Sequence, residues 1–165
     1  MKQLWAPWRM EYIAENKSDD CIFCELPKIN DDLKHNILYR GKHCFIIMNL
    51  FPYNSGHLMV SPYSHKNCIT KMTEEERREL DYLVGQCVTI SRTVHSPEGF
   101  NIGINLGKAG GAGFDEHIHC HIVPRWLGDT NFMPVLSETK VHPEHLKATY
   151  NKLLPHFREI EPLYP

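Results

Sequence analysis

The sequence predicts an α+β domain built on a mostly antiparallel sheet of about five strands, with one long helix and a C-terminal helix. Short β-rich runs separated by turn residues indicate the strands. A long segment with helical spacing of apolar residues indicates the main helix. The 165 residues fit one domain of ordinary size, and 42% hydrophobic with 23% charged residues is typical of globular proteins.

The expected strands are five short runs rich in β-branched and other apolar residues. Gly41, Lys42 and His43 separate the first two runs and suggest a hairpin, and the turn-rich stretch 50–56 leads into the third. The five runs are 35–40, 44–49, 57–62, 100–105 and 117–123. Several strands around one long helix suggest an α+β domain with a mostly antiparallel sheet.

The long helix is predicted from Thr73 to His95. Thr73 and Glu76 form a capping box at its start, and Pro97 and Gly99 end it. Its apolar face is formed by Leu80, Leu83, Val84, Cys87, Val88 and Val94. A terminal helix is expected over 143–158, disturbed at Pro155.

Composition limits the partners and the compartment. The formal charge of −2 and the absence of a Lys/Arg block argue against binding to a nucleic-acid polymer. No window approaches the roughly 18 apolar residues of a membrane span, and the N-terminus lacks signal-peptide features. We therefore expect a cytoplasmic protein whose six cysteines are thiols or metal ligands.

The first twenty residues differ from the rest. The stretch "LWAPWRMEYI" holds two Trp, a Tyr and a Pro, so it is too apolar for a free tail. We expect 1–20 to be an arm that packs on the body or on a partner subunit, and 21–165 to be a single domain.

The stretch "HIHCHIV" over 117–123 carries the chemistry. On a strand, His117, His119 and His121 point one way, toward a cleft, and the apolar residues between them point to the core. Positions 117 and 121 are about 13 Å apart along a straight strand, so all three imidazoles cannot easily bind one metal ion. A histidine-rich strand face without chemistry remains the alternative.

A neutral imidazole suits nucleophilic attack on phosphorus near pH 7. A neighbouring imidazole can assist the leaving phosphate. The glycine-rich loop 107–113 lies just before the histidines and can bring backbone N–H groups to phosphate oxygens. Together these features favour a site for displacement at phosphorus.

Cys21 and Cys24 form a Cys-x-x-Cys pair. Two such thiolates can hold zinc if two further ligands complete the site. A redox pair and a pair without metal are the other readings left open by the residues themselves.

These segments resemble the histidine triad family of nucleotidyl hydrolases and transferases. "NLFPYNSGHLMVSP" (49–62), "GINLGKAGGAG" (103–113) and "HIHCHIVPRW" (117–126) match family segments in family order. "LWAPWRMEYI" and "GDTNFMPV" (128–135) are similar to the bacterial branch related to dinucleoside tetraphosphate phosphorylases and hydrolases. The resemblance covers most of the chain and implies the HIT-like fold.

The resemblance assigns roles to individual residues. It makes His119 the nucleophile, which holds a nucleotidyl intermediate, and His121 the group that contacts the phosphate and assists the leaving group. The implied nucleotide-binding residues are Asn49 at the ribose, His57, Asn105, and the phosphate loop Gly111, Ala112 and Gly113. Phe114 stands where much of the family has a phosphate-binding Gln or Ser, which puts that contact in doubt.

Plainer readings of three of these residues remain. Asn49 can cap a turn, His57 can be a satisfied core histidine, and Asn105 can end a strand.

The resemblance also implies a structural zinc site. Its ligands would be Cys21, Cys24, His65 and His117, which leaves His119 and His121 for catalysis. The other cysteines, Cys44, Cys68, Cys87 and Cys120, are expected to be core or surface thiols. The remaining histidines, His35, His43, His95, His142, His145 and His156, are expected at the surface.

The predicted function is cleavage of adenosine-type nucleotides, with dinucleoside polyphosphates such as Ap4A or Ap3A favoured, at the α-phosphorus. Magnesium on the polyphosphate and a homodimer, which the family forms through its long helix and a strand, accompany this prediction. The alternatives are a phosphoramidate (AMP-lysine) hydrolase, a non-enzymatic nucleotide-binding module and a hydrolase with a catalytic zinc.

Overall fold

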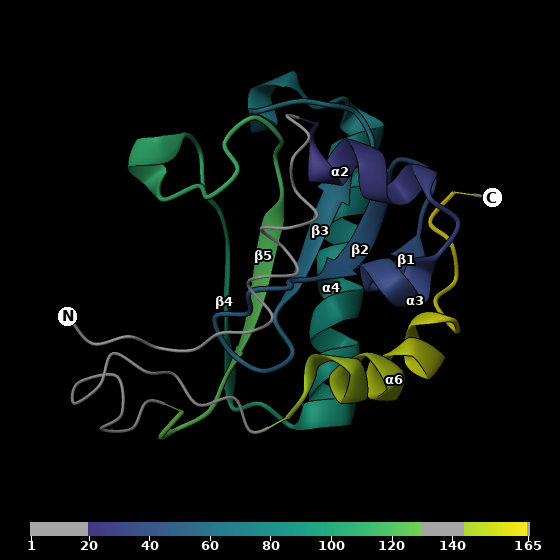
Figure 1. Cartoon of the computed structure of the whole chain (residues 1–165), viewed down its shortest axis with the longest axis vertical. Helices are drawn as coiled ribbons and strands as arrows, with labels where there is room; N and C mark the ends of the chain where they lie inside the picture. The colour runs from purple at the N-terminus through teal and green to yellow at the C-terminus, as the bar shows by residue number, and fades with distance from the viewer. Residues whose placement is uncertain (1–19, 130–143, 165) are drawn as a thin grey trace.

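The computed structural model describes residues 20–129 and 144–164 (Figure 1). The predicted arm, apart from Asp20, lies outside the described residues, as do 130–135 of the "GDTNFMPV" segment and His142.

One five-stranded sheet forms the centre of the molecule. In chain order its strands are β1 (Ile37–Arg40), β2 (Cys44–Met48), β3 (Leu58–Pro62), β4 (Gly99–Ile104) and β5 (Cys120–Arg125). They lie in the order β1-β2-β3-β5-β4, and every neighbouring pair is antiparallel. The predicted fold class is confirmed, including the hairpin at Gly41, whose N–H donates to the Cys44 carbonyl at 2.8 Å.

The histidine strand begins later than predicted, at Cys120 instead of His117. The ladder between β3 and β5 stops at the Val60–Cys120 pair. Beyond it, the hydroxyl of Ser61 donates to the Ile118 carbonyl at 3.0 Å, and Pro62 has no N–H to offer. The Ile118 N–H turns instead to the Lys66 carbonyl, at 2.6 Å. Residues 117–119 therefore form an irregular lead-in to the strand.

The long helix α4 (Glu74–His95) agrees with its prediction. Thr73 caps it, and both hydrogen bonds of the capping box with Glu76 are present. The predicted face packs on the sheet, although Ile90, which was not anticipated, is also buried there. The helix ends with Ser96 in the left-handed conformation, one residue before Pro97.

The C-terminal helix α6 (Leu146–Phe157) is shorter than expected. His145 caps its start, and Pro155 lies inside its last turn without ending it. The Tyr150 hydroxyl donates to the Ile37 carbonyl at 2.9 Å and ties this helix to β1.

Within residues 20–129, five short helical segments were not predicted. They are α2 (Ile22–Glu25), η1 (Leu26–Lys28), α3 (Asp32–His35), η2 (Ile69–Lys71) and η3 (Lys108–Gly110). None of the described helices is long and apolar enough to cross a membrane.

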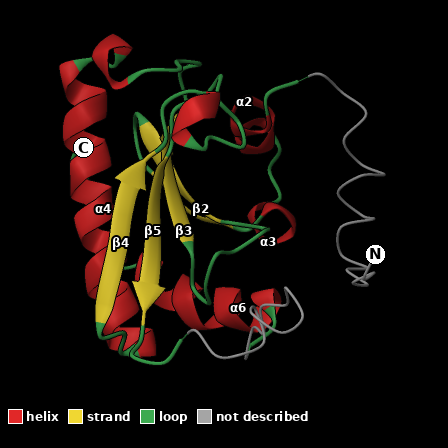
Figure 2. Cartoon of the chain, turned by 90° about the vertical axis from the view of Figure 1, so that its left-hand side faces the viewer, coloured by secondary structure: helices red, strands yellow, loops and turns green. Residues whose placement is uncertain are grey.

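The sheet is covered on both faces. Figure 2 shows α4 along one face and α2 and α3 on the opposite side. The α4 side holds the larger apolar cluster, and the other side holds Phe23, Ile37, Phe45, Ile47 and Met59. Because β2 lies between the two clusters, all five of its residues are buried and its sequence is a continuous apolar run.

A buried carboxylate joins α4 to the β1–β2 hairpin. Glu79 accepts from the backbone N–H groups of Lys42 (3.0 Å), His43 (2.6 Å) and Cys44 (2.7 Å). Gly41 makes the approach possible, since a Cβ there would lie 2.8 Å from both the Glu79 carboxyl and the Cys44 carbonyl oxygen. Hydrogen bonds to a buried charged acceptor are stronger than neutral ones.

We expect Glu79→Gln to lower the free energy of unfolding by about 2–4 kcal/mol, because the amide keeps one acceptor and turns N–H groups toward donors. Urea denaturation measures this loss. Glu75→Gln, at an exposed position in the first turn of the same helix, should cost only a few tenths of a kcal/mol. Equal losses in the two variants would contradict the anchoring role of Glu79.

Candidate active site and metal cluster

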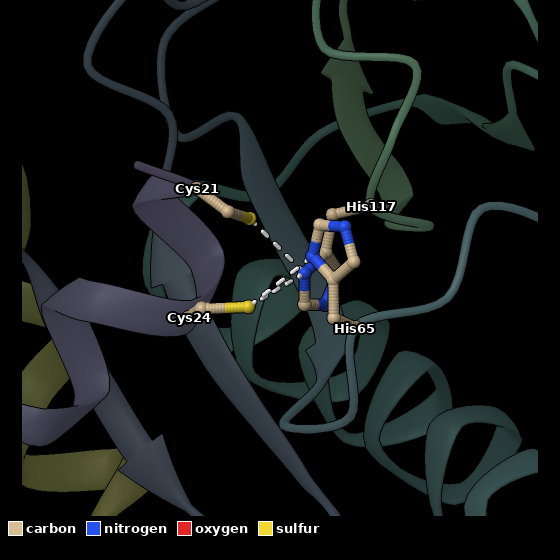
Figure 3. A group of neighbouring side chains, drawn as sticks. All are labelled: Cys21, Cys24, His65 and His117. Carbon is tan, nitrogen blue, oxygen red and sulfur yellow. Dashed lines mark hydrogen bonds between the residues drawn. The ribbon is translucent and has the colours of Figure 1, made fainter. Parts of the chain in front are cut away.

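The four predicted zinc ligands lie together. Cys21 is the N-cap residue of α2 and Cys24 lies within that helix, while His65 follows β3 and His117 precedes β5 (Figure 3). One potential ligand atom from each residue lies within 4.8 Å of the others. The Cys21 sulfur is 3.2 Å from the His117 Nδ1, and the Cys24 sulfur is 3.3 Å from the His65 Nδ1.

This donor set fits a tetrahedral metal site with two sulfur and two nitrogen ligands. The His117 Nε2–H donates to the Pro62 carbonyl at 2.9 Å, so the Nδ1 lone pair faces the sulfurs. Burial, together with the neighbouring Cys24, raises the pKa of the Cys21 thiol to about 11. Metal binding must therefore release its proton.

The imidazole of His119 has a fixed tautomer. Its Nδ1 lies 2.8 Å from the His117 carbonyl oxygen, which can only accept, so Nδ1 carries the proton and Nε2 keeps a lone pair. Burial lowers the pKa of this ring and favours its neutral form. The His119 ring is therefore neutral near pH 7, with a lone pair on Nε2.

The tautomer of His121 follows from a chain of hydrogen bonds. The Tyr53 N–H donates to the His57 Nδ1 at 3.0 Å. The proton of His57 is then on Nε2, which donates to the His121 Nδ1 at 3.0 Å. The His121 Nε2 consequently carries a proton and is a hydrogen-bond donor. Burial, helped by the neighbouring His119, lowers the pKa of His121 to about 4.

The two rings form a complementary pair. His119 and His121 meet edge to face, with centroids 4.7 Å apart. One offers a lone pair at Nε2 and the other offers a proton at Nε2, the combination that attack on a phosphoryl group requires. The three histidines of the motif are more buried than predicted, with 1%, 6% and 8% of His117, His119 and His121 exposed.

Asn49, the residue predicted to bind the ribose, makes hydrogen bonds within the turn that leads to His57. The Asn49 Oδ1 accepts from the Phe51 N–H at 2.9 Å, and its Nδ2 is 3.3 Å from the His57 Nδ1. His57 is fully buried, and its Nε2 lies 3.0 Å from the His121 Nδ1. Asn49 therefore caps a turn, and His57 is a core histidine with hydrogen-bond partners.

The predicted phosphate loop is exposed and held by Asn105. The Asn105 Nδ2 donates to the Gly111 carbonyl at 3.4 Å. Gly111 has a φ of 85°, which favours glycine. Ala112 donates from its N–H to the Gly107 carbonyl at 3.3 Å, and Gly113 is exposed. Phe114 packs edge-on against Phe23, so its side chain takes part in the apolar cluster.

A hollow of about 180 Å³ opens near His121, and the sequence did not predict it. Its walls are Tyr53, Asn54, Asn101, Val123 and Arg125. The Tyr53 ring lies 5.5 Å from the His121 ring. The side chain of Arg125 is fixed by Asp129 at 2.6 Å and by Asn101.

Sequence reasoning also missed Phe23, whose ring stacks on His119 with centroids 4.6 Å apart and planes at 22°. The position of Phe23 between Cys21 and Cys24 placed it near the expected metal site. Its contact with His119, however, depends on the tertiary structure.

The protein belongs to the HIT family, since residues 30–126 match the family model of the HIT domain. It is 37% identical over 158 residues to an AP-4-A phosphorylase of Mycobacterium tuberculosis, an alignment covering 90% of this chain and 80% of that protein. A HIT-like protein of Methanocaldococcus jannaschii is 30% identical over 66% of this chain and 81% of its own length.

Solved structures show the same fold. A Zn-bound histidine triad family protein of Mycobacterium smegmatis matches with a TM-score of 0.67 and 23% identity, covering 85% of this chain and 94% of that one. A hypothetical histidine triad nucleotide-binding protein of Sulfolobus tokodaii gives 0.65 at 26% identity, covering 84% and 90%. The predicted family and its class of activity, a nucleotidyl hydrolase or transferase, are confirmed.

We expect acid to destabilise the protein partly through His121. Its folded pKa of about 4 lies below the ordinary 6.5, so the unfolded state binds the proton first. The contribution is complete above about pH 6.5 and is lost as the pH falls toward 4, by roughly 2–3 kcal/mol. The free energy of unfolding of His121→Gln should therefore fall less than that of the wild type between pH 7 and pH 4.5.

Urea denaturation at the two pH values measures the difference, and any acid release of metal is common to both proteins. His156→Gln, on α6 outside the site, should show the wild-type pH dependence. An equal fall in wild type and His121→Gln would show that His121 does not contribute.

Proposed function

We propose that the protein cleaves dinucleoside polyphosphates at the α-phosphorus through a covalent nucleotidyl intermediate on the His119 Nε2. The observation that carries this proposal is the Nδ1–H···O bond from His119 to the His117 carbonyl, which leaves a lone pair on Nε2 of a ring that packs against the His121 ring, with centroids 4.7 Å apart. The Mycobacterium tuberculosis AP-4-A phosphorylase supports the choice of substrate.

In the first step, the His119 Nε2 forms a bond to the α-phosphorus while the bond to the bridging oxygen breaks. The imidazole gains positive charge, which the His117 carbonyl oxygen stabilises through the Nδ1–H. The His121 Nε2–H donates a hydrogen bond to the departing phosphate. Magnesium on the polyphosphate, if bound, would neutralise further charge. Asn49 and the backbone of 111–113, with Asn105, would hold the ribose and phosphates.

In the second step, water or phosphate attacks the phosphorus and releases neutral His119. Water gives a nucleoside monophosphate and phosphate gives a nucleoside diphosphate. The position of His119 and His121 outside the four-residue cluster argues against the alternative of a catalytic zinc held by the triad.

We expect His119→Ala to lower the turnover of diadenosine tetraphosphate by about 10³-fold or more, because the covalent route is lost. Product analysis with and without phosphate distinguishes the acceptors, since AMP plus ATP means hydrolysis and ADP plus ATP means phosphorolysis. His156→Ala should keep wild-type turnover. Unchanged turnover in His119→Ala would refute the proposal, as would a wild type that binds the dinucleotide but cleaves neither it nor AMP-lysine. Cleavage of AMP-lysine alone would move the proposal to the phosphoramidate class.

We further propose that the metal in the cluster is zinc and that it is structural, because the protein fills all four positions. The purified chain should hold about one zinc, measured by elemental analysis, and its removal should lower the melting temperature. Cys24→Ala should lose the metal, and Cys68→Ala, a half-buried cysteine outside the cluster, should retain it. Equal zinc in the two variants would contradict the assignment.

We also propose that the protein is a homodimer and that it is located in the cytosol. Residues 1–20 would form an arm and 21–165 a single HIT domain. The strand β4 is a sheet edge, and Ile102 on it is 48% exposed. Exposed apolar edges favour pairing with a second copy. We expect a solution mass of two chains by light scattering and a shift toward one chain in Ile102→Lys. A wild-type mass of one chain would contradict the dimer.

A further inference from the structure

Phe23 lies between the metal cluster and the proposed nucleophile. It is on α2, flanked in sequence by Cys21 and Cys24, and only 3% of it is exposed. Its ring stacks on His119 (4.6 Å, 22°) and lies tilted against His117 (5.4 Å, 41°). One side chain inside the metal-binding turn therefore contacts both a proposed ligand and the ring proposed to react.

The stacking of Phe23 on His119 restricts rotation of the imidazole plane, which the hydrogen bond to the His117 carbonyl does not restrict. The Nδ1–H···O bond holds one edge of the His119 ring. Rotation of the ring plane about that bond would still change the direction of Nε2. A stacked aromatic face opposes this rotation, because tilting the imidazole would separate the two rings or drive them into contact.

The position of Phe23 depends in turn on the cluster. A helix of four residues such as α2 has no stability of its own. It is held by the packing of Phe23 in the smaller apolar cluster and by the convergence of Cys21 and Cys24 on the histidine ligands. A metal ion bound by these residues would fix both ends of the turn that presents the ring.

We propose that Phe23 is a positioning residue for the His119 imidazole, and that the metal in the Cys21, Cys24, His65 and His117 cluster aligns this imidazole by fixing the turn that carries Phe23. The catalytic part rests on the proposed function. The stacking and its dependence on the metal concern the free protein and do not rest on it.

The chain offers a matched control. Phe45 is a fully buried phenylalanine of the same apolar cluster, and its ring stacks on Tyr63 with centroids 5.3 Å apart. Phe23→Leu and Phe45→Leu therefore remove equal apolar volume on the same side of the sheet. Phe23→Tyr keeps an aromatic ring at the position and tests for rescue.

The first measurement is kinetic, on proteins shown by elemental analysis to hold equal metal. Because misalignment of a nucleophile affects the chemical step more than binding, Phe23→Leu should lower kcat for diadenosine tetraphosphate by about 10-fold or more with KM unchanged. Phe23→Tyr should recover most of this loss. Phe45→Leu should keep kcat within about twofold of wild type while losing a similar amount of thermal stability. Equal kcat in the two leucine variants would reduce Phe23 to a packing role and overturn the proposal.

The second measurement needs no substrate. The ring C–H signals of His119, identified by their loss in His119→Ala, should be shifted upfield in the NMR spectrum by the stacked ring. The shift should disappear in Phe23→Leu, persist in Phe45→Leu, and diminish when a chelator removes the metal from folded wild type. A signal that is unchanged in Phe23→Leu or after chelation would overturn the proposal. If the wild type cleaves no dinucleotide while these shifts behave as expected, the proposed function fails and the positioning by Phe23 stands.

Discussion

The imidazole and backbone of His117 form the interaction on which the site depends. Its Nε2–H donates to the Pro62 carbonyl, its Nδ1 faces the two sulfurs, and its own carbonyl oxygen accepts a hydrogen bond from the His119 Nδ1–H. One residue thus joins the end of β3, the cysteine turn and the proposed nucleophile. Because the His117 carbonyl oxygen can only accept a hydrogen bond, the tautomer of His119 is fixed as well.

Burial and hydrogen bonding act together on the four histidines around the site. Removal from water lowers the pKa values of His117, His119 and His121, which favours neutral rings. A neutral imidazole has one donor and one acceptor, so the hydrogen bonds made by Tyr53 and His57 determine which nitrogen of His121 carries the proton. The site therefore contains two neutral imidazoles, one with a lone pair at Nε2 and one with a proton at Nε2, and only their hydrogen-bond partners distinguish them.

Much of this arrangement could be predicted from the sequence. Alternation along "HIHCHIV" correctly separated core residues such as Ile122 from the histidines, and the capping box located the start of α4. The metal ligands were predicted from the resemblance of their pattern to a known family, and the structure brings them together. The alternation and the capping box depend on short-range spacing, which a sequence displays directly. The four candidate ligands lie up to 96 residues apart, so only the family resemblance connected them.

The remaining features depend on contacts between distant segments. The early end of the β3–β5 ladder depends on Ser61, and the position of His57 behind His121 depends on how the turn at 49–57 folds over β5. The stacking of Phe23 on His119 joins residues 96 positions apart in the chain. No local periodicity encodes such pairings, so the supporting residues of the site could not be identified before the fold was known.

The irregular lead-in at 117–119 has a consequence for how this fold gains a reactive centre. The proposed reactive segment, 117–119, directly continues the regular strand β5, beyond the point where the β3–β5 ladder ends. It is not a separate insertion. Residues 117–119 are anchored by β5, which begins at Cys120. Because they are not part of the regular strand, their side chains need not alternate between the two faces of the sheet. The backbone of 117–119 is thereby held in place by the sheet, while the side chains of these three residues can point in directions that a regular strand would not allow. No extra residues are needed.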